Sequence, residues 1–123
     1  MIVHGWGNYS KLDSEVFFPD TLEKLKQNLL MTKSLIGRGL GRSYGDSANN
    51  KQIIQTSKLK KIINFDKQNG CIECESGVTI YELNELTIKE GWFVPVTPGS
   101  SYVTLGGALA SDIHGKNHHL EGS

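Results

Sequence analysis

Hydrophobic residues recur at helical spacing in two parts of this chain. The first series predicts an amphipathic helix over about residues 21–32, with Asp20 or Thr21 as its N-cap. Its apolar positions are Leu22, Leu25, Leu29 and Leu30. A second helix is predicted to begin after Val78, with apolar positions at Ile80, Leu83, Leu86 and Ile88. Gly91 stands where a left-handed residue commonly ends a helix.

Short extended runs separate these helices. They comprise residues 16–19, 34–36, 52–56, 61–65, 71–74 and 92–96. Asn69 and Gly70 favour positive φ, which predicts a hairpin turn between the fourth and fifth of these runs. No internal repeat or low-complexity segment interrupts the pattern. The sequence therefore predicts an α+β fold over residues 1–123, with a small mixed sheet and flanking helices.

Composition narrows the possible functions. The 13 basic and 13 acidic residues cancel, so there is no global electrostatic case for binding nucleic acid or an anionic membrane. No apolar run approaches the roughly 20 residues that span a bilayer, and residues 1–7 lack the features of a signal peptide. Cys71 and Cys74 would lie on opposite faces of a strand, which favours a structural role and a reducing, cytoplasmic compartment.

A glycine-rich turn at Gly37–Asp46, here called the glycine loop, is the most distinctive segment. Its glycines permit close approach of a ligand to the backbone, and successive N–H groups in such a loop can converge on phosphate oxygens. Arg38 and Arg42 add charge suited to phosphate. The spacing fits neither a Rossmann fingerprint nor a Walker A loop, and the residues after Asp46 are not helical. A surface loop without a ligand is the alternative.

A second cluster of small residues, Thr97–Gly115, is here called the second segment. Thr104 can cap a short helical turn whose small residues leave the N-terminal N–H groups open to a phosphate or a ring carbonyl. Close packing of a small-residue helix explains the same pattern. Taken with the glycine loop, the second segment suggests two backbone cradles for one large ligand, such as a diphosphate-bearing cofactor with an extended ring system.

Four motifs together resemble the FAD-binding half of vanillyl-alcohol-oxidase (PCMH-type) flavoproteins. They are Gly-Arg-Gly-Leu-Gly-Arg-Ser-Tyr-Gly-Asp, Pro-Val-Thr-Pro-Gly, Val-Thr-Leu-Gly-Gly-Ala and Ser-Asp-Ile-His-Gly-Lys-Asn-His-His. The resemblance runs from about Gly5 to the last residue, and within the superfamily it is strongest to bacterial enzymes of the decaprenylphosphoryl-ribose 2′-oxidase type. The last motif is the most specific of the four.

The resemblance implies a non-covalent FAD. The glycine loop would wrap its diphosphate, and the second segment would contact the rest of the cofactor, with His114 on the substrate side of the flavin. Arg42 stands where many relatives carry a histidine bonded to the flavin, and arginine cannot form that bond. The implied cofactor contacts are Gly37, Arg38, Gly39, Leu40, Gly41, Arg42, Ser43, Tyr44, Gly45, Asp46, Gly99, Thr104, Leu105, Gly106, Gly107, Ser111, Asp112, Ile113 and His114.

The resemblance also implies a reaction, the oxidation of a secondary alcohol on a sugar or a polyprenyl-phosphate sugar. A short-chain reductase would act on the keto product, and a lipid-linked substrate would bring a cytoplasmic enzyme to the membrane. The principal base and the substrate domain of the relatives lie beyond the length of this chain, so residues 1–123 are expected to be an N-terminal fragment that is inactive alone. A non-catalytic nucleotide- or phosphate-binding module is the alternative.

The remaining candidates have simpler explanations. His114 and His118 are four residues apart, but no neighbouring pattern supports a metal site, so none is expected. Tyr44 could stack on a ring or pack within its loop. Trp6 and Trp92 are expected in the core.

Overall fold

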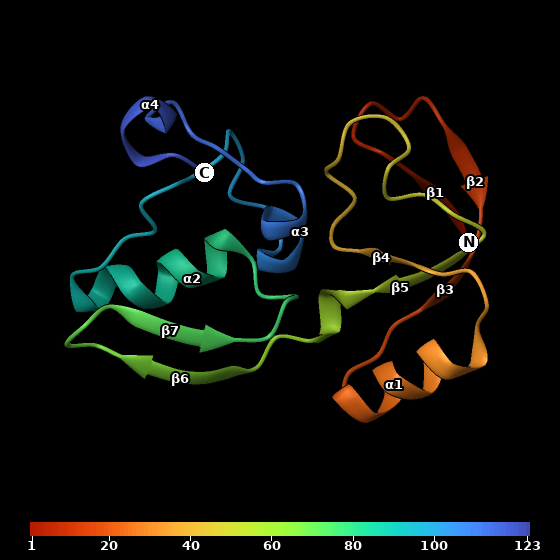
Figure 1. Cartoon of the computed structure of the whole chain (residues 1–123), viewed down its shortest axis with the longest axis horizontal. Coiled ribbons are helices and arrows are strands. Elements are labelled where there is room, and N and C mark those ends of the chain that lie inside the picture. Colours follow the sequence, from red (N-terminus) through yellow and green to blue (C-terminus); the bar gives the residue numbers. More distant parts are fainter. The chain divides into compact units, whose positions relative to one another are not determined.

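A parallel sheet forms the centre of the first of two compact units, Met1–Leu59. Its strands are β3 (Glu15–Phe17), β4 (Ile36–Arg38) and β5 (Gln52–Gln55), in the order β3-β5-β4. The central strand carries Ile53 and Ile54, both buried although they point to opposite faces. A continuous apolar pair is what a parallel strand covered on both faces requires. The computed structural model describes all residues from Met1 to Ser123 (Figure 1).

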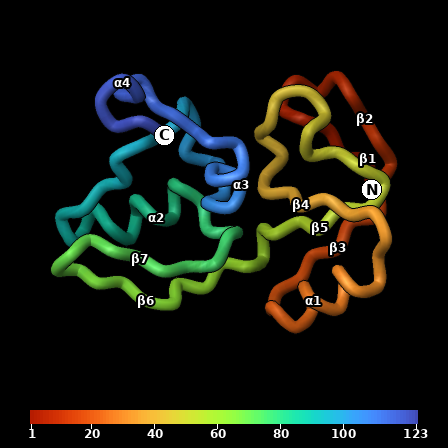
Figure 2. Tube along the Cα trace, in the orientation of Figure 1, coloured from red at the N-terminus to blue at the C-terminus, as the bar shows by residue number.

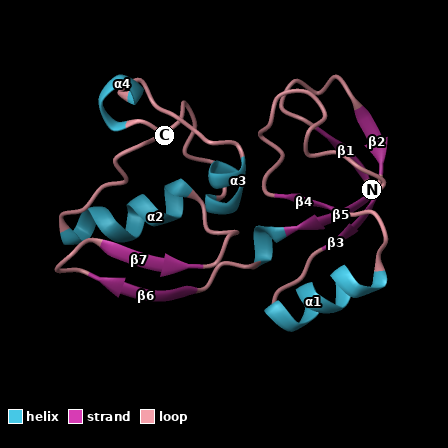
Figure 3. Ribbon diagram, in the orientation of Figure 1, coloured by secondary structure: helices cyan, strands magenta, loops and turns pink.

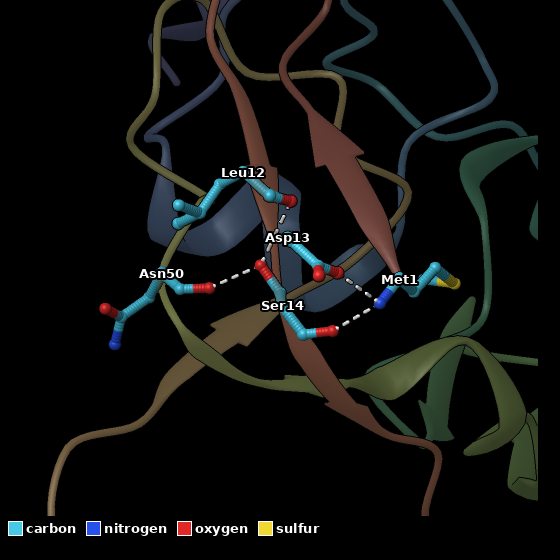
Figure 4. Close-up of polar contacts among 5 residues, drawn as sticks. All are labelled: Met1, Leu12, Asp13, Ser14 and Asn50. Atoms are coloured by element: carbon cyan, nitrogen blue, oxygen red, sulfur yellow. Dashed lines mark hydrogen bonds and ion pairs between the residues drawn. The ribbon is translucent and has the colours of Figure 1, made fainter.

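An antiparallel pair precedes this sheet. Strands β1 (Ile2–His4) and β2 (Lys11–Asp13) pair with Val3 opposite Leu12, and Val3 is buried. The α-amino group of Met1 donates to Asp13 Oδ1 at 2.9 Å and to the Ser14 carbonyl at 2.7 Å (Figure 4). The buried Ser14 hydroxyl donates to the carbonyl of Asn50 at 2.7 Å, which joins the end of β2 to the residues that lead into β5.

Helix α1 (Leu22–Met31) begins where the hydrophobic spacing predicts it. Of the two candidate caps, Thr21 is the one used, because its hydroxyl accepts from the Lys24 N–H at 3.2 Å. Asp20 instead pairs with the Lys24 ammonium, and the hydrogen bond from Lys24 lowers the pKa of this carboxyl. A single 3₁₀ turn, η1 (Thr56–Lys58), follows β5.

The second unit, Lys60–Ser123, contains a hairpin and three helices. Strands β6 (Ile62–Asp66) and β7 (Cys71–Cys74) pair antiparallel around Gly70, whose φ of +67° confirms the predicted turn. Helix α2 (Ile80–Thr87) lies along this hairpin and continues into the 3₁₀ turn η2 (Ile88–Glu90), which ends at left-handed Gly91 (Figure 3). Helices α3 (Leu105–Ala110) and α4 (His118–Glu121) complete the unit (Figure 2).

The core of the second unit forms between α2 and the hairpin. It consists of Val78, Ile80 and Leu83, with Ile72, Cys74, Val94, Val103 and Leu105 packed against them. Cys71 is exposed whereas Cys74 faces the core, so the two thiols lie on opposite faces of β7 as predicted. Burial raises the pKa of the Cys74 thiol. None of the helices combines the length and apolar composition needed to cross a bilayer.

Several predictions differ from the structure. Residues 92–96 pair with no strand, and helix α4 lies outside the helices and extended runs that the sequence predicts. Parallel and antiparallel pairs both occur, but in separate sheets. Trp6 and Trp92 are not core residues, with 57% and 38% of their surfaces exposed. The indole N–H of Trp92 donates to the Lys67 carbonyl at 2.8 Å, so its ring covers the hairpin turn instead.

Candidate functional site: a glycine loop and a capped small-residue helix

The glycine loop follows β4 and leads back toward β5 in the first unit. None of the backbone N–H groups from Gly39 to Gly45 donates a hydrogen bond to another group of the protein. Gly41 and Gly45 adopt φ values of +66° and +64°, as the glycine content predicts. Added Cβ atoms at Gly37 and Gly45 would meet nothing within 4 Å. The loop therefore presents a run of unused donors on open backbone, which is what an anion-binding loop requires.

Arg38, at the start of the glycine loop, hydrogen-bonds to residues on either side of the loop in the sequence. Its guanidinium donates to the Ala48 carbonyl at 2.9 Å, to Asn49 Oδ1 at 2.8 Å and to the His4 carbonyl at 2.6 Å. Burial lowers the pKa of this guanidinium, although an arginine keeps its charge in proteins at all ordinary pH values. The predicted role of Arg38 as a phosphate-binding charge beside the loop does not match these contacts. Three of its five N–H donors already bind His4 of β1 and Ala48 and Asn49, which follow the loop.

Arg42 is arranged differently. Its guanidinium lies over the ring of Trp6, 4.9 Å from the centroid, and it makes no hydrogen bond or ion pair within the protein. The side chain is exposed. Trp6 therefore supports the guanidinium through a cation–π contact while the donors of Arg42 stay free. Of the two loop arginines, Arg42 is the one whose charge remains available to an anion.

The other loop residues are largely exposed. Tyr44 has 86% of its surface exposed, so the alternative in which this ring packs within its loop is wrong. The Asp46 carbonyl accepts from the Asn49 N–H at 2.8 Å and closes a turn at the end of the loop. Leu40 and Ser43 are half-buried.

The second segment lies in the second unit, where two helix N-termini meet. Thr104 caps α3 by accepting from the Gly107 N–H at 3.1 Å, as predicted. Thr79 caps α2 by accepting from the Glu82 N–H, and the Glu82 carboxylate accepts in return from the Thr79 N–H and hydroxyl. The two caps form a β-bridge with each other, and both are buried. The pattern Thr-x-x-Glu is a signature of this capping box, so the box could have been predicted from the sequence.

The expectation of open N–H groups at the start of α3 is wrong. Leu105 donates to the Val78 carbonyl at 2.7 Å and Gly106 to the Ser76 carbonyl at 2.9 Å. Gly107 and Ala108 donate to the hydroxyl and the carbonyl of Thr104. An added Cβ at Gly106 would lie 2.9 Å from Ser76 Cβ, so close packing explains this glycine. The carbonyls of Val78 and Ser76 and the Thr104 cap therefore occupy all four N–H donors at the start of α3.

The residues after α3 form an exposed turn. Asp112 adopts a φ of +45°, and the Ile113 N–H donates to the Ala108 carbonyl at 3.1 Å. Ser111 and His114 are exposed, and an added Cβ at Gly99 would meet nothing within 4 Å. The His114 ring meets the His118 ring edge to face, with centroids 5.5 Å apart. His118 contacts His119 in the same way, and its Nδ1 lies 3.1 Å from the Gly115 carbonyl.

The sequence did not predict that the N-terminal residues His4–Trp6 contact the glycine loop. His4 has no role in the sequence-based interpretation, yet its carbonyl binds Arg38. The Trp6 N–H donates to the Ser43 carbonyl at 3.0 Å, and an added Cβ at Gly5 would overlap the Gly45 carbonyl oxygen. Gly5 was the available signal, because a glycine permits close approach between two backbone segments.

The chain belongs to the FAD-binding domain family, whose pattern matches residues 16–123. Its architecture is that of a PCMH-type FAD-binding domain. Two relatives illustrate the match. The decaprenylphosphoryl-beta-D-ribose oxidase of Mycolicibacterium smegmatis is 43% identical over 93 residues, which are 74% of this chain and 20% of that protein. The L-gulonolactone oxidase of Scyliorhinus torazame is 28% identical over 115 residues, covering 89% of this chain and 26% of that protein.

Solved structures agree on the fold. Cholesterol oxidase from Brevibacterium sterolicum superimposes with a TM-score of 0.74 and 19% identity, over 93% of this chain and 24% of that chain. An alkyldihydroxyacetonephosphate synthase gives a TM-score of 0.69 and 20% identity, over 87% and 22%. The matched residues therefore span about a fifth to a quarter of the length of each of these four proteins.

The residues of the glycine loop fit an FAD diphosphate. Unused N–H donors and the free guanidinium of Arg42 supply neutral and charged hydrogen-bond donors on one short loop. Open backbone at Gly37 and Gly45 leaves room for close approach. The second segment offers no comparable set of free donors at its helix terminus.

Proposed function

We propose that this chain is the FAD-binding part of a flavin-dependent oxidoreductase that oxidises a secondary alcohol of a sugar or sugar-like substrate. The similarity to a ribose oxidase, at 43% identity over 93 residues, carries the proposal. The glycine loop supports it, because its unused N–H groups fit the cofactor that the family binds. The proposed product is the corresponding ketone, on which a short-chain reductase would act. A cytoplasmic location, with membrane contact through a lipid-linked substrate, belongs to the same proposal.

Each part of the chain has a proposed task. The backbone from Gly39 to Tyr44 binds the diphosphate, and Arg42 adds a positive charge to it. Arg38 holds the loop through its contacts with His4, Ala48 and Asn49. When bound, FAD supplies the hydride acceptor for alcohol oxidation. Residues 111–114 are proposed to lie beside the flavin ring, with the exposed imidazole of His114 toward the substrate.

The cofactor is proposed to be held without a covalent bond. Arg42 occupies the loop position at which a flavin-linking histidine is expected, and a guanidinium does not form that bond. Acid precipitation of the purified intact protein separates non-covalently bound flavin from covalently linked flavin. We expect all of the flavin in the supernatant, and flavin that stays with the pellet would contradict this part of the proposal.

The reaction is tested by anaerobic reduction of the flavin. The intact protein is mixed with a polyprenyl-phosphate ribose, with a free alditol, with L-gulonolactone or with D-lactate, and its flavin absorbance is followed. Bleaching by a sugar substrate supports the proposal, and bleaching by D-lactate alone overturns the substrate class. A protein that binds FAD but is bleached by none of the four favours the non-catalytic module. A protein that takes up no FAD overturns the proposed function.

A further inference from the structure

The N-terminal segment His4–Trp6 contacts the glycine loop at three places. The His4 carbonyl accepts from the Arg38 guanidinium at 2.6 Å. Gly5 packs so closely that an added Cβ would overlap the Gly45 carbonyl oxygen and would lie 3.1 Å from that of Ser43. The Trp6 N–H donates to the Ser43 carbonyl at 3.0 Å. These contacts reach the start, the middle and the end of the loop.

The same segment lies outside the family match, which begins at residue 16. The family pattern therefore covers the glycine loop but not the residues that support it here. The segment His4–Trp6 continues from strand β1, which ends at His4 and pairs with β2. The position of this segment is consequently set by a sheet of its own.

We propose that His4–Trp6 is a built-in support of the FAD site, in which Gly5 fixes the loop backbone and the Trp6 ring positions the Arg42 guanidinium for the diphosphate. The inference rests on the proposed function of the glycine loop. Two facts favour a positioning role for Trp6. Its ring lies under the Arg42 guanidinium, which has no other partner. Its backbone N–H already donates to the Ser43 carbonyl of the loop. A preoriented arginine loses less side-chain freedom on binding an anion, so the affinity for the cofactor rises.

The backbone part is tested with two alanine substitutions in one tripeptide. Gly5→Ala places a methyl group against the Gly45 carbonyl, whereas an added Cβ at Gly7 would meet nothing within 4 Å, so Gly7→Ala is the matched control. In the intact protein without cofactor, we expect trypsin to cleave faster after Arg42 in Gly5→Ala than in Gly7→Ala. FAD binding should weaken about tenfold or more in Gly5→Ala and stay near wild type in Gly7→Ala. Equal cleavage and equal affinity would overturn this part.

The part played by Trp6 is tested by rescue and by a double-mutant cycle. Cation–π contacts of this kind contribute about 0.5–1 kcal/mol at exposed sites, so Trp6→Leu should weaken FAD binding about two- to fivefold. Trp6→Phe keeps an aromatic face and should recover most of the affinity. Tyr9→Leu, at a residue with 96% of its surface exposed, is the matched control and should bind FAD like the wild type.

The cycle distinguishes positioning from a general structural effect. Arg42→Gln should weaken FAD binding and reduce its dependence on salt concentration, because an exposed charge contact is screened by ions. If Trp6 acts through Arg42, Trp6→Leu should have little further effect in the Arg42→Gln background. An equal loss in both backgrounds would overturn the positioning role. Wild-type protein that binds no FAD would overturn the proposed function together with this inference, whereas tight binding by every variant would overturn the inference alone.

Discussion

The guanidinium of Arg38 occupies the space that a Cβ at Gly41 would need. An added Cβ there would overlap Nη2 and Cζ of Arg38. The guanidinium cannot easily move aside, because three hydrogen bonds hold it to His4, Ala48 and Asn49. Gly41 also adopts positive φ, so this position excludes other residues for two separate reasons.

Two alanine substitutions separate these reasons. Gly41→Ala and Gly45→Ala introduce the same unfavourable φ, but only the first brings a methyl group against another residue. We expect Gly45→Ala to lower the free energy of unfolding by about 1 kcal/mol, and Gly41→Ala to lower it by about 2–3 kcal/mol. Urea denaturation of both variants measures the difference. Equal losses would show that Arg38 moves aside without cost.

Removing the cap of α3 should destabilise the second unit. Thr104→Ala removes the hydroxyl that accepts from the Gly107 N–H in a fully buried setting. We expect a loss of about 1–2 kcal/mol in the free energy of unfolding, at the upper end for an N-cap. Thr21→Ala, at the exposed cap of α1, is the control and should cost about 0.5–1 kcal/mol. A smaller loss at Thr104 than at Thr21 would contradict the role of the paired caps.

Glu82 should make the second unit sensitive to acid. Burial raises the pKa of this carboxyl, but hydrogen bonds from Lys60 and from the N–H and hydroxyl of Thr79 outweigh it and the net pKa is lowered. A folded-state pKa below the unfolded value stabilises the protein above the unfolded pKa, and this stabilisation is lost as pH falls through the folded one.

The measurement is the thermal midpoint of wild type and Glu82→Gln between neutral pH and pH values below the ordinary glutamate pKa. Wild type should be the more stable near neutral pH, and the gap should narrow on acidification. A gap that stays constant with pH would show that the Glu82 charge contributes nothing. In a Lys60→Met background, Glu82→Gln should lower the thermal midpoint less, because Lys60→Met removes the ion pair between Lys60 and Glu82 at 2.6 Å.

The two cysteines should differ in reactivity. Cys71 is exposed at the hairpin, whereas Cys74 packs on the core and burial raises the pKa of its thiol. Thiolate is the reactive form, so alkylation at mildly alkaline pH should label Cys71 well before Cys74. Peptide mass spectrometry after short labelling measures the ratio. Urea should remove the difference, and equal rates in the folded protein would contradict the packing of Cys74.

Local signals predicted the elements of this fold well. The apolar spacing predicted α1 within one residue at each end, and it predicted α2 as one helix with the 3₁₀ turn η2 that ends at Gly91. Asn69-Gly70 predicted the hairpin turn. Such features depend on neighbours in the sequence. Trp6 and Trp92 were misplaced because hydrophobic size alone predicts burial, whereas each ring covers a nearby loop or turn.

The candidate site was only partly predictable. Glycine content predicted the positive φ values of the loop and its open backbone. Arg38 is hydrogen-bonded within the protein and Arg42 is not. This difference depends on acceptors contributed by residues far away in the sequence, such as His4. For the same reason the occupied N–H groups at the start of α3 could not be predicted, since their acceptors Ser76 and Val78 lie in another loop.

The strand order of the first unit has a consequence for how the protein is made. The central strand β5 is the last of its three strands to be synthesised, and β3 and β4 pair only with it. Until residue 55 has left the ribosome, both outer strands lack a partner. Chains emerge far more slowly than such segments move. The nascent protein therefore makes both outer strands before the central strand that pairs with them, and the sheet from which the glycine loop leaves forms only once β5 has been made.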